Sequence, residues 1–192
     1  MKKTFTFLCA ALISVTGFFA TAQTSENAPF KVKRTTPYPV INGAKGVELF
    51  NNGDIVTDPG AGAGGADYSW SYDDNTWGTN ASSALGYHLL SDFSVPDQQW
   101  AVDSIILFGY QTGSTTTSTF NNARIQIWSG NPDVAGSTVI WGDTTTNRFT
   151  STYWTNTYRG TDFTNTQRPV MAIVCNTTGL VIPQGVEYWV EY

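Results

Sequence analysis

Carboxylates that could act as a catalytic pair are the first feature to test in this sequence. Glycoside hydrolysis needs only two, about 5–5.5 Å apart in retaining enzymes and about 6.5–9.5 Å apart in inverting ones. Glu187 and Glu191 would share one strand face around Trp189, but at about 3.3 Å per residue they would lie about 13 Å apart. Asp73 and Asp74 are adjacent and would point to opposite faces. We therefore assign no catalytic residue.

The histidine and cysteine content does not indicate a nucleophile or a zinc site. His88 is the only histidine, and the sequence has no G-x-S-x-G nucleophile elbow. Zinc sites usually draw on several His or Cys ligands. We expect His88 to be a hydrogen-bonded or surface residue, which would meet Asp92 only if that segment were helical. Cys175 lies in the apolar stretch "PVMAIVCN", where a buried small hydrophobic residue is expected rather than a reactive thiol.

The stretch "GAGAGG", residues 60–65, matches the G-x-G-x-x-G pattern of dinucleotide-binding loops. In such sites the motif joins a strand to a helix, whose N-terminal amides hold the pyrophosphate. Here the motif precedes "ADYSWSYDD", which alternates as a strand does. We therefore expect a loop at this position and no organic cofactor.

Clustered acidic and amide side chains leave a calcium site open. Calcium takes about six to eight oxygen ligands from carboxylates, amides and backbone carbonyls. The stretches "NNGDIVTDPG" and "YDDN" supply such groups, and none fits the EF-hand spacing. The candidate metal ligands are Asp54, Asp58, Asp73 and Asp74, with Asn51, Asn52 and Asn75 beside them. Turn-forming Asp and Asn residues explain the same pattern, so both interpretations stand.

The aromatic content is the strongest indication of a binding function. The chain has 7 Trp and 9 Tyr, more than a core of this size needs. Tyr68, Trp70 and Tyr72 would project from one strand face as a row, and such rows stack on the apolar faces of sugar rings. The alternation favours a second interpretation, in which the row faces the core and Asp67, Ser69, Ser71 and Asp73 face solvent.

A second candidate site is the uncharged insert "GSTTTSTFNNA", residues 113–123, which carries six hydroxyl side chains. It contains no proline and is flanked by alternating segments, so it is a long hairpin loop rather than a mucin-like spacer. Long loops at the edge of a sandwich often carry binding functions. Phe120, Asn121 and Asn122 are its distinctive groups and join the aromatic row as candidate ligand-binding residues.

Residues 1–22 have the pattern of a bacterial signal peptide. Lys2 and Lys3 precede an apolar stretch, and Ala20-Thr21-Ala22 predicts cleavage before Gln23. The stretch is short for a membrane span and no later segment is long enough, so we expect a secreted or cell-surface protein without membrane insertion. Residues 23–46 have no hydrophobic period and predict an extended, partly disordered lead-in.

The remainder of the chain is acidic. The formal net charge is −5, and fourteen of the fifteen acidic residues follow Val47, against four arginines. A body of this charge repels nucleic acid and anionic membranes. Nucleic acid is therefore excluded as a partner.

A period of two predicts strands through residues 47–192. The runs are rich in Thr, Val, Ile, Tyr and Trp, and turn signals such as "SGNPD", "GDTTTN" and "NTTG" separate them. Clear runs are "AVDSIILFGYQ", "ARIQIW", "STVIWG", "FTSTYWTNTY", "RPVMAIVC" and "GVEYWVEY". Only "NASSALGYHLL" could form a short helical turn. The prediction is an all-β fold, a two-sheet antiparallel β-sandwich of jelly-roll type, and the last run suggests truncation at Tyr192.

These residues also carry a resemblance to a known kind of module. The stretches "SDFSVPDQQWAVDSIILFGYQTGSTTTSTFNNARIQIWSGNP", "WGDTTTNRFTSTYWTNTYRG", "RPVMAIVCNTTGLVIP" and "GVEYW" occur in that order. Together they resemble an uncharacterised β-rich module of large secreted bacterial proteins, those exported by the type IX system with a C-terminal sorting domain. The resemblance implies export and further domains in the full-length protein, and it implies no activity or functional residues.

Three functions follow as expectations. The first is a secreted or cell-surface, non-catalytic β-sandwich module for adhesion, glycan or protein contact, or spacing within a larger protein. The second is a secreted carbohydrate-active hydrolase whose carboxylates converge from distant strands. The third is a purely structural domain, stabilised by calcium if the acidic stretches bind it.

Overall fold

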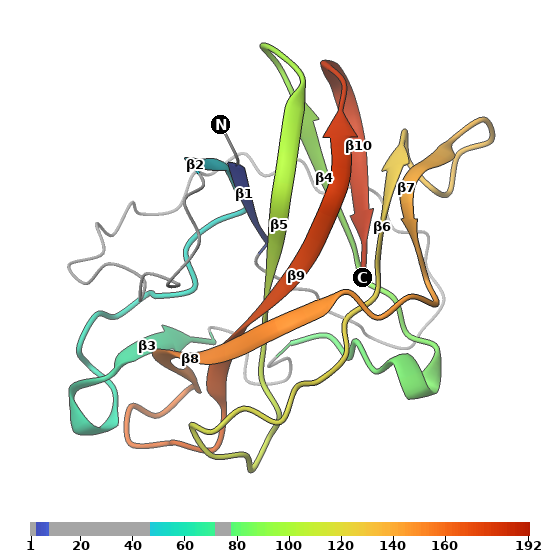
Figure 1. The fold of residues 1–192 in the computed structure, drawn as a ribbon. Helices are drawn as coiled ribbons and strands as arrows, with labels where there is room; N and C mark the ends of the chain where they lie inside the picture. Colours follow the sequence, from blue (N-terminus) through green and yellow to red (C-terminus); the bar gives the residue numbers. More distant parts are fainter. Residues whose placement is uncertain (1–2, 8–46, 72–77) are drawn as a thin grey trace.

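Strands and two short 3-10 turns make up the regular structure of the described residues in this computed structural model (Figure 1). The described residues are 3–7, 47–71 and 78–192. The strands are β1 (Lys3–Phe7), β2 (Val47–Asn51), β3 (Asp67–Trp70), β4 (Leu90–Val95), β5 (Trp100–Gly109), β6 (Ile125–Ser129), β7 (Thr138–Asp143), β8 (Phe149–Gly160), β9 (Pro169–Ile182) and β10 (Gly185–Glu191). Within these ranges, no helix is long and apolar enough to span a membrane.

Two sheets form the predicted β-sandwich, which is confirmed. One has six strands in the order β2-β1-β5-β9-β8-β3, and the other has four in the order β4-β10-β6-β7. Figure 1 shows β5 and β9 lying across β4 and β10, while the long β8 curves beneath them toward β7. Most neighbours are antiparallel, as predicted, but β1 pairs in parallel with β2 and β5, and β3 pairs in parallel with β8.

The main core lies between the two sheets. Ile105 of β5 packs there with Ile127 of β6 and Val190 of β10, all essentially inaccessible to solvent. Burying a side chain of this size contributes roughly 1.5–3 kcal/mol. Cys175 belongs to the same cluster, and burial raises the pKa of its thiol to about 12. The expectation that Cys175 is buried is confirmed.

A second apolar cluster covers the opposite face of the larger sheet, so β5 is buried on both faces. Ile106 and Phe108 pack there, whereas Val102 packs in the main core. Strict alternation along "AVDSIILFGYQ" predicts all three on one face, because they are separated by even numbers of residues. A register shift between Val102 and Ser104 explains the difference, because one extra residue moves the preceding side chains to the other face.

The predicted turn "NTTG" is wrong as a strand boundary, because β9 continues through it. Asn176 pairs with Ser104, and Leu180 pairs with Val102, so three residues of β9 face one residue of β5. The Thr177 hydroxyl donates to the Val102 carbonyl at 2.7 Å, and Gly179 takes a φ of 82°. The turn residues therefore build a bulge that bends β9.

Strand β1 lies in the segment for which the sequence predicts a signal peptide. Its backbone pairs with both β2 and β5. Cleavage before Gln23 would remove this strand from the exported chain and leave the facing edges of β2 and β5 without it. The cleavage stays a prediction, and the lead-in at residues 23–46 lies outside the described residues. Strand β2 begins at Val47, where the sequence predicts that the module begins.

Candidate functional site

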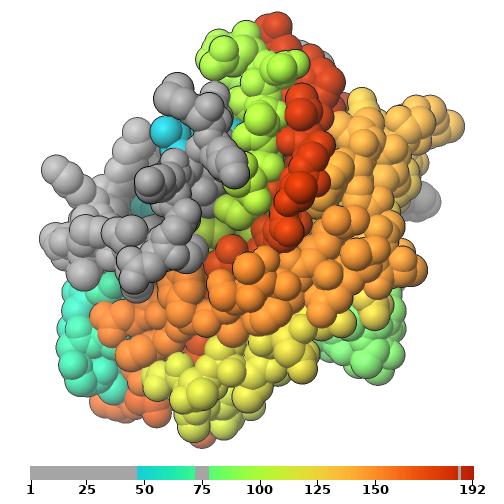
Figure 2. Space-filling view, in the orientation of Figure 1, coloured from blue at the N-terminus to red at the C-terminus, as the bar shows by residue number. Residues whose placement is uncertain are grey.

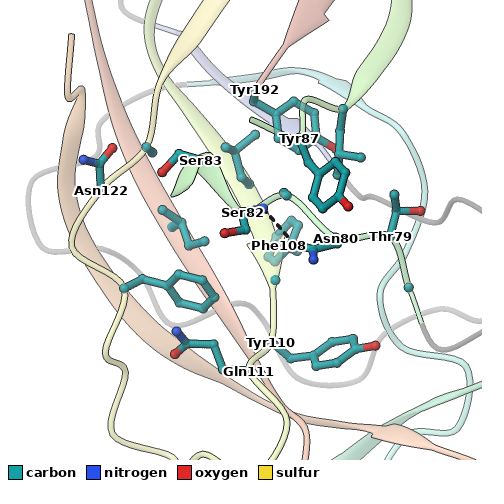
Figure 3. A pocket seen from close by; sticks show the side chains of 18 of the residues that line it. Thr79, Asn80, Ser82, Ser83, Tyr87, Phe108, Tyr110, Gln111, Asn122 and Tyr192 are labelled. Atoms are coloured by element: carbon teal, nitrogen blue, oxygen red, sulfur yellow. Dashed lines mark hydrogen bonds between the residues drawn. The ribbon is translucent and has the colours of Figure 1, made fainter. Parts of the chain in front are cut away.

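Two loops at one end of the sandwich enclose a cavity of about 890 Å3 beside the end of β5 (Figure 3). One wall comes from residues 78–89, and the other comes from residues 109–112 and 119–124. In Figure 1 these segments lie in green and yellow at the end of the molecule away from the β4–β5 turn. The larger sheet adds apolar lining from both of its faces: Leu107 and Ile173 from the main-core side, and Phe108 and Val170 from the other side.

The uncharged insert forms much of the second wall and joins β5 of the larger sheet to β6 of the smaller one, so the predicted hairpin is wrong. It is tied to the body at several points. The Gly113 amide donates to the Gln167 carbonyl at 2.8 Å, and the hydroxyls of Ser118 and Thr152 lie 2.9 Å apart. The Asn147 side chain bonds the backbone at both Asn121 and Ala123. Figure 2 shows this yellow segment packed below the orange β8. The side of the cavity that it forms is therefore preorganised.

The first wall contains the short turn that the sequence predicts in "NASSALGYHLL". A 3-10 helix spans Ser83–Leu85, and Gly86 ends it in the left-handed conformation, with φ 69°. The Asn80 side chain accepts a hydrogen bond from the Ser82 amide at 2.9 Å, drawn in Figure 3. Reciprocal backbone bonds of 2.8 and 3.0 Å join Leu89 to Tyr192. These contacts anchor the loop to the final residues of the chain, beside β10.

Aromatic rings and neutral polar groups face each other across this cavity. Figure 3 shows Tyr87 and Tyr192 at one side, with Tyr110 and Gln111 at the opposite side. Neutral polar groups of the wall are Thr79, Asn80, Ser82, Ser83, Gln111, Thr112, Thr119, Asn121 and Asn122. Such a lining suits a ligand with apolar faces and many hydroxyl groups.

The surroundings of Tyr110 raise the pKa of its hydroxyl above the ordinary value, at which a phenol is already neutral at physiological pH. Burial raises its pKa, and the nearby guanidinium groups of Arg159 and Arg168 oppose that rise without cancelling it. The phenol therefore stays neutral at physiological pH and can donate a hydrogen bond. Its ring packs against Gly78, where a Cβ would lie 3.2 Å from the phenolic oxygen.

Half of the predicted ligand-binding set lies at this cavity. Phe120, Asn121 and Asn122 all line it. Phe120 also packs against the main core, while both asparagines are exposed. Trp70 and Tyr68 are not among the lining residues, and Tyr72 lies outside the described residues.

Tyr68 is a core residue and offers no ring face to a ligand. Its side chain is 0% exposed, and its ring contacts Trp70 and Phe163 at centroid distances of 5.9 and 5.0 Å. The predicted solvent-facing side of this strand is wrong, because Asp67, Ser69 and Ser71 are also buried. Residues 57–58 pair with one edge of β3 and β8 pairs with the other, and the side chains on both faces are buried, so alternation does not separate core from surface here.

The predicted calcium ligands are not brought together where the structure describes them. Asp54 is exposed, while Asp58 bridges to Tyr68 and accepts a hydrogen bond from the Thr57 hydroxyl at 2.7 Å. Asp73 and Asp74 lie outside the described residues. Across the described ranges, no group of three or more His, Cys, Asp or Glu side chains could hold a metal.

The glycine motif leads into a strand, as the sequence predicts. A 3-10 turn at Ala63–Gly65 precedes β3, and its Gly64 has a left-handed φ of 68°. Three residues of 3-10 turn do not provide the N-terminus of an α-helix that a pyrophosphate requires. The described geometry therefore does not fit a dinucleotide at this loop.

His88 pairs with Glu191 rather than with Asp92. Its Nδ1 lies 3.0 Å from one carboxylate oxygen of Glu191, and the other oxygen accepts hydrogen bonds from Gln126 and from the Trp128 indole. The Trp189 indole donates to Glu187 at 3.0 Å. Both carboxylates of β10 thus orient tryptophans of the smaller sheet.

Sequence reasoning missed Asn80 and Tyr87 of the opposite wall, and Tyr110 and Gln111, which directly precede the insert. Their loops are joined only through the fold, so no spacing along the chain reveals the cavity. The available signal was a second polar, Ser/Asn-rich stretch before β4.

The fold and the cavity define the class of this protein as a two-sheet β-sandwich with a loop-built pocket at one end. Comparisons with protein-family models, curated proteins and solved structures found no match to this chain.

Proposed function

We propose that this chain is a secreted or cell-surface, non-catalytic β-sandwich module that binds a glycan in the cavity at the end of β5. The proposal rests on one observation: aromatic and amide side chains from two separate loops line the same pocket. They are Phe120, Asn121 and Asn122, with Tyr87 and Tyr110. Its volume, about 890 Å3, lies within the range of about 300–1,000 Å3 common for small-molecule sites.

The chemistry of the lining supports a sugar. A pyranose ring presents an apolar face that packs on aromatic rings, and its hydroxyls both donate and accept hydrogen bonds. Side-chain amides such as Gln111 and Asn122 supply both kinds of group, and the neutral Tyr110 phenol adds a donor. Hydrogen bonds hold the insert in place, so less conformational entropy is lost when a ligand binds.

Export and attachment to further domains belong to the same proposal. The sequence pattern of residues 1–22 and the type IX resemblance support them. An extracellular form that begins at a residue other than Gln23 would contradict the predicted cleavage.

Replacing Tyr87 with alanine is expected to weaken glycan binding about 3–10-fold, because one aromatic face leaves the pocket. Tyr87 is 52% exposed, so the thermal midpoint should stay within error of the parent protein. Isothermal titration with the bound oligosaccharide measures the effect. Leu85→Ala is the matched control, since Leu85 is 65% exposed in the same loop and does not line the cavity.

A glycan array combined with a hydrolysis screen on the exported protein tests the function itself. Retention of a glycan without cleavage supports the proposal. Turnover of any polysaccharide would show instead a carbohydrate-active hydrolase. The absence of both binding and hydrolysis would favour a spacer or a structural domain. In that case, a melting temperature lowered by a calcium chelator would indicate the calcium-stabilised form.

A further inference from the structure

The charged groups that line the cavity are cationic. Among the described lining residues, the ionisable side chains are Arg124, Arg159, His88 and three tyrosines, Tyr87, Tyr110 and Tyr192. The whole chain carries a net charge of −5 and has only four arginines after Val47. Two of those four thus lie at one pocket of an acidic protein.

Arg124 has the least-satisfied of these side chains. It is half-buried, and its Nε is shielded from solvent and has no hydrogen-bond partner in the structure. Arg148 pairs with Asp143, whereas the described residues include no ion pair of Arg124. The Nε of Arg148 is also buried without a partner, but Arg124 is the one of the two that lines the cavity. A guanidinium at a cavity wall can give charge-assisted hydrogen bonds to the carboxylate or sulfate of a ligand.

The carboxylates that adjoin the wall are already engaged. Glu191 accepts from His88, Gln126 and Trp128. Asp143 accepts from the amides of Thr145 and Thr146 and pairs with Arg148 at 3.0 Å. Neither group is among the cavity lining, so neither is placed to neutralise Arg124 from inside the pocket.

A second cationic zone lies at the Tyr110 side of the cavity. Arg159 and Arg168 both lie close enough to the Tyr110 hydroxyl to oppose the rise of its pKa. Arg159 also donates to the Ser69 hydroxyl at 2.9 Å, which fixes its position. Guanidinium groups therefore lie at two places in the lining of this cavity, in a protein whose net charge is −5.

We propose that the glycan bound in this cavity is acidic, and that Arg124 pairs with its carboxylate or sulfate group. The inference rests on the proposed glycan-binding function and specifies its ligand class. Both acidic groups share the chemistry that a guanidinium recognises, and a uronic acid and a sulfated sugar are its two sources.

Matched oligosaccharides separate charge from sugar shape. An oligogalacturonate hexamer and its methyl ester share one backbone and differ in charge, and a sulfated galactan oligosaccharide and its desulfated form are the second pair. Titration calorimetry with the exported protein should show at least one acidic form binding about tenfold more tightly than its neutral partner. That advantage should fall as salt concentration rises.

Arg124→Gln should reduce the advantage to about threefold or less, and Arg124→Lys should retain part of it because the charge remains. Removing a buried donor without a partner should not lower the thermal midpoint, which verifies folding. Arg148→Lys is the control for Arg124→Lys, since it replaces a guanidinium outside this cavity and keeps a cation beside Asp143. The affinity advantage of the acidic over the neutral oligosaccharide should be the same in this variant as in the parent protein.

Equal binding of the acidic and neutral forms would overturn this inference and leave glycan binding intact. An undiminished preference in Arg124→Gln would overturn the role of Arg124. Failure of every array glycan and of all four oligosaccharides to bind would instead overturn the proposed function.

Discussion

Replacing Tyr68 with alanine is expected to lower the free energy of unfolding by about 3–5 kcal/mol, as for other large buried aromatic side chains. Tyr68 is 0% exposed, and its ring contacts both Trp70 and Phe163. Its hydroxyl donates to the Asp162 carbonyl at 2.6 Å and accepts from the Asp162 amide at 3.2 Å. Truncation would therefore leave a cavity and unpaired backbone groups.

Urea denaturation followed by tryptophan fluorescence measures this loss. Tyr68→Phe is the matched variant, because it keeps the ring and removes only the hydroxyl, at a cost of about 1–3 kcal/mol. Glycan affinity of Tyr68→Phe should equal that of the parent protein. A Tyr68→Ala protein with unchanged stability but lost binding would restore the aromatic row as the ligand platform.

Gly142→Ala is expected to destabilise the smaller sheet by about 2–5 kcal/mol, combining backbone strain with overpacking. A Cβ at this position would lie 2.2 Å from the Ile125 carbonyl oxygen and 2.9 Å from the Cα of Gln126. Gly142 has a φ of 82°, and the obstructing atoms are backbone that cannot rotate away. The pairing of β6 with β7 must open to admit the methyl group.

Gly136→Ala separates the two contributions to that effect. Gly136 has a φ of 99°, but a methyl group on its Cα would meet nothing within 4 Å, so backbone strain of about 1–2 kcal/mol is the whole expected cost. Thermal melting of both variants measures the difference. Equal losses for the two glycines would show that the close approach of β6 to Gly142 is not present in solution.

The architecture could be predicted because alternation dominates the sequence. The run around Ile105 and Ile106 forms β5, and the run around Ile127 forms β6, as expected. The assignment of side chains to the two faces of a strand failed where a bulge interrupts the alternation. The bulge opposite Val102 and the continuation of β9 through Gly179 depend on pairing between distant segments, which no local pattern reports.

The candidate site could be predicted in part for the same reason. The sequence shows a long uncharged loop between two predicted strands, and its distinctive side chains are Phe120, Asn121 and Asn122. Tyr87 could not be assigned, because its loop meets the insert only after the sheets are assembled. The orientation of the aromatic row around Tyr68 could not be predicted, because the strand is buried on both faces and neither face is exposed to solvent.

The most direct test of the central claim is an amide-resolved NMR titration of the exported, isotope-labelled protein with an oligosaccharide retained on the glycan array. We expect saturable shift changes confined to residues 78–89, 109–112 and 119–124, the two loops around the cavity, with the oligosaccharide recovered uncleaved. Shift changes centred on another surface, such as the smaller sheet around Trp128 and Trp189, or cleavage of the sugar during the titration, would contradict glycan binding at this cavity.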